Sequence, residues 1–87
     1  MSEQYSSPTR LVGKIINENG EPIASYATIT LGNQNISTTA NERGEFTLSY
    51  LEPMDEEVII EAEGFISNIV LVQLLSGQTN DMGEITM

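Results

Sequence analysis

The sequence predicts an all-β fold, a seven-stranded Greek-key β-sandwich. Three observations point to it. Apolar and polar residues alternate through several short segments, which is the period of a strand with one buried face. β-Branched and aromatic residues, which favour strands, gather in these segments. Turns containing glycine, asparagine or proline separate the segments roughly every 8–12 residues, as in a sandwich or small barrel.

The first three strands are expected at residues 11–16, 26–31 and 36–40. In the first, Leu11 and Ile15 share one face. A turn at Asn19-Gly20, closed by a proline, leads into the second, where Ala27, Ile29 and Leu31 alternate with polar residues. The polar turn at 32–35 then favours a hairpin with the short, threonine-rich third strand.

The remaining strands are expected at residues 45–50, 58–63, 67–74 and 82–87. Gly44 starts the first of these, and Phe46, Leu48 and Tyr50 resume the alternation. The 51–56 segment is expected to be a loop broken by proline. The inward sets of the next two strands are Val58, Ile60 and Ala62, and then Val70, Val72 and Leu74.

Length and composition exclude several classes of function. The 87 residues make one domain with a modest core, and the chain has neither cysteine nor histidine. Thirteen acidic residues against three basic ones give a formal net charge of −10. This charge repels phosphate, so we expect neither nucleic-acid binding nor attachment to anionic membranes.

The polar N-terminal residues 1–9 are expected to form a flexible lead or linker, with one domain over 10–87. This segment lacks a basic start followed by an apolar core, so no signal peptide is visible. No segment approaches the ~20 apolar residues that span a bilayer.

An ordered set of turn and strand residues runs through the chain from the first strand to the last. The set is Gly13, Asn17, Gly20, Pro22, Ile23, Tyr26–Leu31, Thr38, Thr39, Gly44, Phe46, Leu48, Gly64, Phe65, Val70, Val72, Leu74, Gly77 and Met82–Ile85. Over residues 11–87 it resembles the carboxypeptidase regulatory-like domain family. The resemblance implies a transthyretin-like sandwich without catalytic residues or cofactors of its own. It also implies an accessory module of a periplasmic, cell-surface or secreted bacterial protein. One departure, a segment between Pro22 and Ala27 that is one residue longer than usual, predicts a bulge at the start of the second strand.

Catalytic and metal-binding readings find little support in the residue types. Glu61 and Glu63 share one strand face, which an exposed surface explains without acid–base chemistry. The sole lysine, Lys14, could form an amide crosslink to Asn80 as in Cna B-type adhesin domains, but strand alternation favours an exposed lysine. The segments 17–21 and 55–57 lack the order of a calcium loop, and we expect no metal site there.

Sugar binding would require exposed aromatic side chains beside polar groups. Tyr5, Tyr26 and Tyr50 are the candidates, and tryptophan is absent. We favour packing or edge positions for them. A small glycan- or peptide-binding module that uses the turns 33–35 and 41–45 remains the alternative function.

A set of apolar residues lies opposite the predicted core faces, and it is the candidate contact face for a neighbouring domain, a protein partner or a second copy. If several of these residues are adjacent across strands, the apolar patch exceeds what a lone monomer exposes. Two alternatives stay open: the N-terminal lead covers them, or the register of the sixth strand is shifted. The set is Val12, Ile16, Ile59, Ile69 and Leu71.

Overall fold

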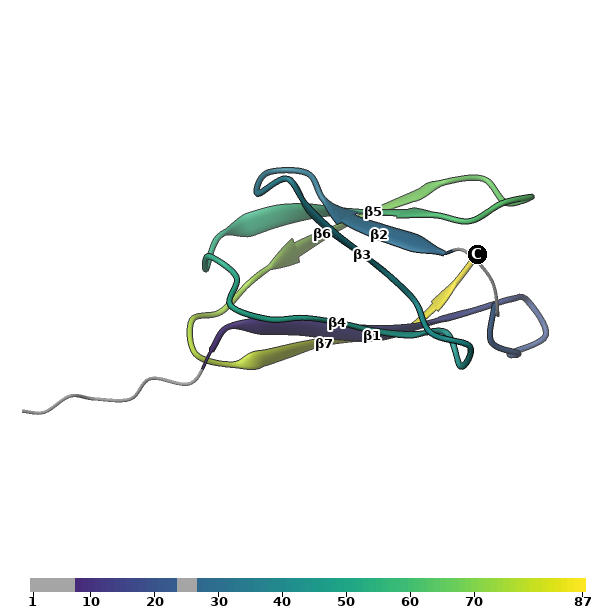
Figure 1. The fold of residues 1–87 in the computed structure, drawn as a ribbon, viewed down its shortest axis with the longest axis horizontal. Coiled ribbons are helices and arrows are strands. Elements are labelled where there is room, and N and C mark those ends of the chain that lie inside the picture. The colour runs from purple at the N-terminus through teal and green to yellow at the C-terminus, as the bar shows by residue number, and fades with distance from the viewer. Residues whose placement is uncertain (1–7, 24–26) are drawn as a thin grey trace, which may run out of the picture.

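The computed structural model describes residues 8–23 and 27–87, which fold into two stacked β-sheets without a helix (Figure 1). None of these residues forms a helix that could cross a membrane. Seven strands occur, as the sequence predicts. They are β1 (Arg10–Ile16), β2 (Thr28–Leu31), β3 (Ile36–Thr39), β4 (Glu45–Leu48), β5 (Asp55–Glu61), β6 (Asn68–Gln73) and β7 (Thr79–Thr86).

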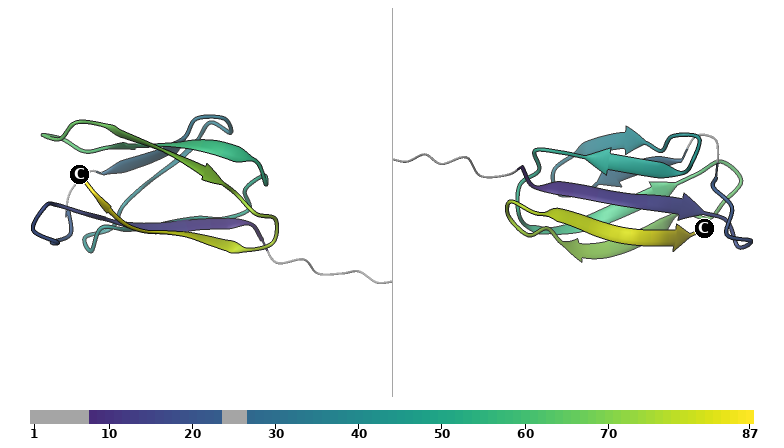
Figure 2. Two further views of the ribbon diagram at one scale, coloured as in Figure 1. Left: turned by 180° about the vertical axis from the view of Figure 1, so that it is seen from behind. Right: turned by 90° about the horizontal axis from the view of Figure 1, so that it is seen from below.

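The strands divide into a three-stranded sheet of order β4-β1-β7, here called sheet A, and a four-stranded sheet of order β3-β2-β5-β6, called sheet B. β1 pairs with β4 antiparallel and with β7 parallel, whereas every pair in sheet B is antiparallel. The edge strands β3 and β4 lie on one side of the sandwich, and β6 and β7 lie on the other (Figures 1 and 2).

The core between the sheets is aliphatic, because alternate residues of each strand point inward. Leu11, Ile15 and Ile29 are fully buried. The inward alternation predicted for β5 and β6 is confirmed, since Val70 and Val72 pack against the core and Leu74 is buried within it. The whole buried cluster is Leu11, Ile15, Ile23, Ala27, Ile29, Leu31, Phe46, Leu48, Leu51, Val58, Ile60, Ala62 and Leu74.

Two glycines allow sheet A to close tightly. A Cβ on Gly13 would lie 2.7 Å from the Phe46 ring, so the missing side chain makes room for this aromatic core residue. Gly44 has a φ of 79°, and a Cβ there would collide with the main-chain carbonyl oxygen of Ile15. Both positions therefore bring β4 and its preceding turn close to β1.

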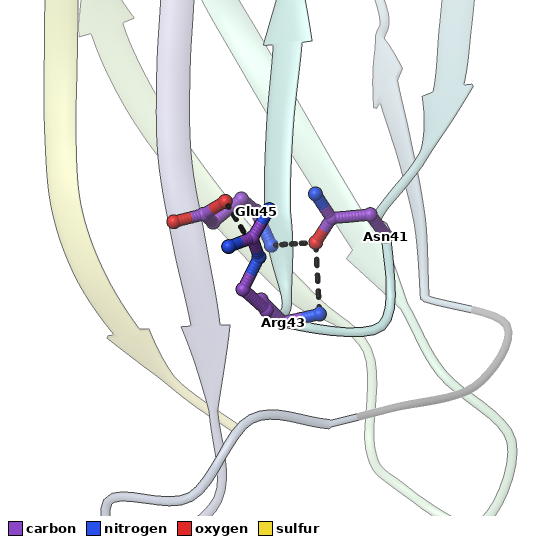
Figure 3. A network of polar contacts seen from close by, with 3 residues as sticks. All are labelled: Asn41, Arg43 and Glu45. Carbon is purple, nitrogen blue, oxygen red and sulfur yellow. Dashed lines mark hydrogen bonds and ion pairs between the residues drawn. The ribbon is translucent and has the colours of Figure 1, made fainter.

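The two turns that flank sheet A are built alike because the sequence repeats Asn-Glu-x-Gly-Glu at 17–21 and 41–45. In the second, Asn41 Oδ1 accepts main-chain hydrogen bonds from Arg43 and Glu45 at 2.9 and 3.0 Å (Figure 3). Asn17 Oδ1 accepts the equivalent bonds in the first turn. An asparagine side chain that mimics a backbone turn explains why these segments reverse the chain.

Several strand boundaries differ from the sequence prediction, and three of the differences bear on the core or on the loops. β5 begins at Asp55, within the segment expected to be a loop, and β7 begins at Thr79, before the expected strand at 82–87. β4 ends at Leu48, so the prediction that Tyr50 continues the inward alternation is wrong. Tyr50 has a φ of 59° and is 82% exposed, and Leu51 fills the core instead. The bulge predicted at the start of the second strand involves residues 24–26, which lie outside the described residues.

Candidate functional site

The five residues of the candidate contact face do not form one surface. Val12 lies on the outer face of sheet A, half-buried between Thr47 of β4 and Asp81 of β7. Ile59, Ile69 and Leu71 lie on the outer face of sheet B, on the opposite side of the sandwich. A single patch across all five residues is therefore ruled out by the two-layer arrangement.

Ile16 is buried, and its predicted outward position is wrong. Only 7% of its surface is exposed, although Ile15 beside it is also buried. The chain folds back after β1, so that Pro22 forms a bridge with Ile16, and the Ile16 carbonyl accepts a hydrogen bond from Met87 N. Strict alternation fails at this strand end because the returning segment encloses both faces.

The remaining three residues form a compact apolar surface, here called the sheet B patch (Ile59, Ile69 and Leu71). Ile59 pairs directly with Ile69 across β5 and β6, and Leu71 follows two residues along the same face. Ile69 is 64% exposed and Leu71 is 75% exposed. The register that places them outward is the one expected from the sequence.

Carboxylates surround the sheet B patch without any compensating cation in the sheet. Glu57 pairs with Leu71, and Glu61 lies two residues beyond Ile59 on the same strand face. None of the four strands of sheet B contains lysine or arginine. The three basic residues of the chain, Arg10, Lys14 and Arg43, belong to sheet A or its flanking turn.

A hollow of about 370 Å³ lies at one end of the sheet B patch. Leu71 and Gln73 of β6 border it, and Asp55 and Glu57 of β5 contribute their acidic character. Asn33 from the β2–β3 turn lies on its far side, with its amide donating to the Asp55 carbonyl at 3.0 Å. The hollow thus combines an apolar margin with negative charge.

A buried acid beside this hollow was not expected from the sequence. Glu56 is only 2% exposed, and its Oε1 accepts hydrogen bonds from the main-chain N–H of Asn33 at 2.7 Å and of Glu57 at 2.9 Å. Its Oε2 has no hydrogen-bond partner among the described residues. Extending the alternation of Val58 and Ile60 backward by one step would have revealed the inward position. Glu56 fixes the β2–β3 turn against β5.

The acids considered for catalysis or metal binding do not converge. Glu61 and Glu63 are exposed. Within the described ranges, no group of three or more acidic side chains is placed to hold a metal ion. Asn17 and Asn41 use their side-chain oxygens inside their own turns. These two oxygens are therefore used in turn formation.

The amide crosslink considered for Lys14 is not supported by the positions of the two residues. Lys14 lies opposite Glu84 of β7, whereas Asn80 lies opposite Leu11. The Asn80 side chain donates to the carbonyl of Arg10 at 2.9 Å and accepts from the N–H of Leu75 at 3.0 Å. Asn80 therefore holds the β6–β7 loop against β1.

Of the three tyrosines, only Tyr50 lies within the described residues, and Tyr5 and Tyr26 lie outside them. Tyr50 is exposed in the loop after β4. The neighbouring polar residues Gln34 and Glu52 hydrogen-bond to each other through side chain and main chain. Asn33 is likewise engaged with Asp55, so the polar atoms of this region are largely used within the fold.

Comparisons with known proteins agree with this architecture. The chain matches a family model described as the carboxypeptidase regulatory-like domain over residues 10–87. No curated protein matches it. Among solved structures, it is similar to part of a 9R-lipoxygenase from Cyanothece PCC8801, with a TM-score of 0.58 and 11% identity. That similarity covers 99% of this chain and 18% of the lipoxygenase chain, and it concerns the fold alone.

Proposed function

Because the chain belongs to the carboxypeptidase regulatory-like domain family, we propose that it is a non-catalytic accessory module that acts through interdomain or protein–protein contacts. We place this module in a periplasmic, cell-surface or secreted bacterial protein, as the family resemblance suggests. The sheet B patch is the observation that supports the contact function. Three neighbouring aliphatic residues on a regular sheet face, two of them well exposed, are better explained by a partner than by core packing.

The surrounding chemistry favours contacts over catalysis. The sequence has no histidine or cysteine, and no group of three or more acidic side chains among the described residues is placed to hold a metal ion. General acid–base or nucleophilic catalysis requires such groups to be held together. Glycan binding through the turns at 33–35 and 41–45 is the weaker alternative, because Asn33 and Asn41 already bond within the fold.

The test measures the binding of an uncharged apolar dye, and the association state by light scattering, for three proteins. We expect the wild-type chain to bind the dye or to associate. The double variant Ile69→Lys with Leu71→Lys should lose whichever of these two properties the wild type shows. Thr47→Lys, on the exposed outer face of sheet A, is the matched control and should behave as the wild type. A wild-type chain that is strictly monomeric and binds no dye would overturn the proposal.

A further inference from the structure

The four sheet edges of the sandwich are not protected equally. Unpaired strand edges promote association with other chains, and proteins limit this association with short edge strands, charged residues or β-bulges. β3 and β4 are four residues long. β7 is longer, but it carries Asp81 and Glu84, its pairing shifts between Val12 and Lys14, and Gly83 has a φ of 72°. β6 has none of these protective features. Its six residues, Asn-Ile-Val-Leu-Val-Gln, are uncharged, and they pair with β5 without a register shift.

The alternation of hydrogen-bonded and non-hydrogen-bonded residue pairs between β5 and β6 shows which main-chain groups of β6 face the open edge. In antiparallel strands, pairs that exchange hydrogen bonds alternate with pairs that do not. Leu74 N donates to the Met54 carbonyl at 2.9 Å, so Val72 and Val70, two and four residues earlier, also bond to β5. The intervening residues, Ile69, Leu71 and Gln73, therefore direct their N–H and C=O groups away from the sheet.

The hydrogen bonds between β5 and β2 lead independently to the same assignment of hydrogen-bonded pairs between β5 and β6. Gly32 N donates to the Glu57 carbonyl at 2.9 Å, so the odd-numbered residues of β5 bond to β2. Its even-numbered residues, including Val58, are left to bond to β6. None of the hydrogen bonds found among the described residues reaches the outward main-chain groups of Ile69, Leu71 or Gln73.

Backbone and side chains therefore offer binding surfaces at the same residues. Ile69 and Leu71 present free main-chain groups along the edge and exposed aliphatic side chains on the outer face. A strand added to this edge would gain ladder hydrogen bonds and would pack its own outward side chains against the sheet B patch.

The charge around β6 indicates what such a strand must carry. Asp55 and Glu57 lie at one end of the patch, beside the hollow, and Glu61 lies at the other. An added strand would lie about 10 Å from β5, two inter-strand spacings away, which a lysine or arginine side chain can bridge to a carboxylate. With no cation in sheet B, the partner would supply the only positive charge there.

We propose that β6 accepts an extended segment of another polypeptide as a fifth strand of sheet B, with apolar residues against Ile69 and Leu71 and with basic residues at its flanks. This inference rests on the proposed contact function and specifies the partner's chemistry. A second copy of the chain fits less well, because each copy has a net charge of −10 and β6 carries no cation. Pairing two β6 strands would also enlarge the exposed apolar surface instead of covering it.

The probe is a fluorescently labelled octapeptide of alternating valine and threonine with lysine at both ends, followed by anisotropy. We expect it to bind about tenfold or more tightly than the same peptide with glutamate at both ends, and to weaken as salt is raised. A version N-methylated at every valine and threonine, which lacks the N–H groups of both edges and so cannot pair in either orientation, should bind at least about tenfold more weakly.

The protein variants separate the edge from the apolar face. Leu71→Pro removes an outward N–H that β5 does not use, and proline is tolerated at such edge positions. Leu71→Ala is the matched control, since it trims the same side chain and keeps the N–H. Peptide binding should be lost in the proline variant and should persist, somewhat weakened, in the alanine variant.

The outcomes distinguish this inference from the proposed function. Equal binding of the N-methylated peptide, or equal effects of the two Leu71 variants, would overturn strand addition while leaving the sheet B patch as a contact face. Dye binding without peptide binding would do the same. A dimer that Leu71→Pro dissociates would show that β6 pairs with itself and would contradict a basic partner.

Discussion

The two sheets of this sandwich treat their surfaces differently. In sheet A, Gly13 lies against the Phe46 ring and Gly44 lies against the main chain of Ile15. The outer face of this sheet carries charges of both signs around Val12. Sheet B has no cation in its strands, exposes aliphatic residues, and ends in the uncharged edge strand β6. The difference fits our proposal that the outer surface of sheet B serves recognition, while the close approaches in sheet A serve packing.

The strongest test of sheet A is Gly44→Ala. A Cβ at Gly44 would meet the Ile15 carbonyl, and alanine would also be strained at a φ of 79°. We expect a loss of about 4 kcal/mol in the free energy of unfolding, measured by urea denaturation. Gly20→Ala is the control: its φ is similar at 81°, but the space around it is open, so the loss should be about 1 kcal/mol.

Adjacent proline substitutions in β6 separate the inner and outer sides of that strand. Val70→Pro removes a ladder hydrogen bond to β5 and should destabilise the fold by about 3 kcal/mol. Leu71→Pro should cost less than about 1 kcal/mol, because its N–H faces the open edge. If thermal or urea unfolding shows equal losses of stability for the two variants, the assignment of which β6 residues hydrogen-bond to β5 is wrong.

A smaller effect is expected where Phe46 covers Gly13. Alanine at position 13 would force the Phe46 ring to move, at a cost of about 2 kcal/mol in the free energy of unfolding. Gly32→Ala is the control in sheet B's first turn, where the nearest atom would lie 3.6 Å away, and its stability should change by less than about 0.5 kcal/mol. If both variants unfold alike, close packing at Gly13 does not distinguish sheet A.

The smallest expected effect tests the charge difference between the outer faces. Thr30 lies opposite Ile59, diagonal to Glu57 and Glu61, so Thr30→Lys should stabilise the protein by about 0.5 kcal/mol at low salt. Thr47→Lys, opposite Val12 and diagonal to Arg10 and Lys14, should give no gain. Thermal unfolding at low and high salt would check both, since added salt should erase the difference. A gain in both variants would mean that net charge alone, not its placement, sets the effect.

Much of the fold could be predicted because period-two alternation fixes both the strand and its inward face. The predicted core residues Leu11, Ile29, Val58 and Leu74 are buried as expected. The predicted outward positions of Ile69 and Leu71 are also confirmed by their exposure. The match of residues 10–87 to one family agrees with the resemblance carried by the glycines, turns and strand patterns.

Alternation alone could not predict the exceptions, which arise where strands end. At Ile16 a returning segment buries a side chain that the pattern places outward, and at Tyr50 a positive φ turns the chain out of the strand. The inward position of Glu56 was not predicted, because a buried carboxylate is unfavourable unless another segment supplies hydrogen bonds. Here the main-chain N–H of Asn33, in the β2–β3 turn, supplies one.

The sequence by itself determined the number of strands, most inward-facing residues, the turn chemistry of the two Asn-Glu-x-Gly-Glu segments and the excess of acid, because these depend on neighbours along the chain. Only the tertiary structure decided which outward residues meet. Because of the strand order, Val12 lies on the outer face of sheet A, whereas Ile59, Ile69 and Leu71 lie on the outer face of sheet B. The same order places β6, and not β2 or β5, at a sheet edge. The reason is that sheet edges and outer faces are created by pairing between distant segments, which local periodicity does not specify.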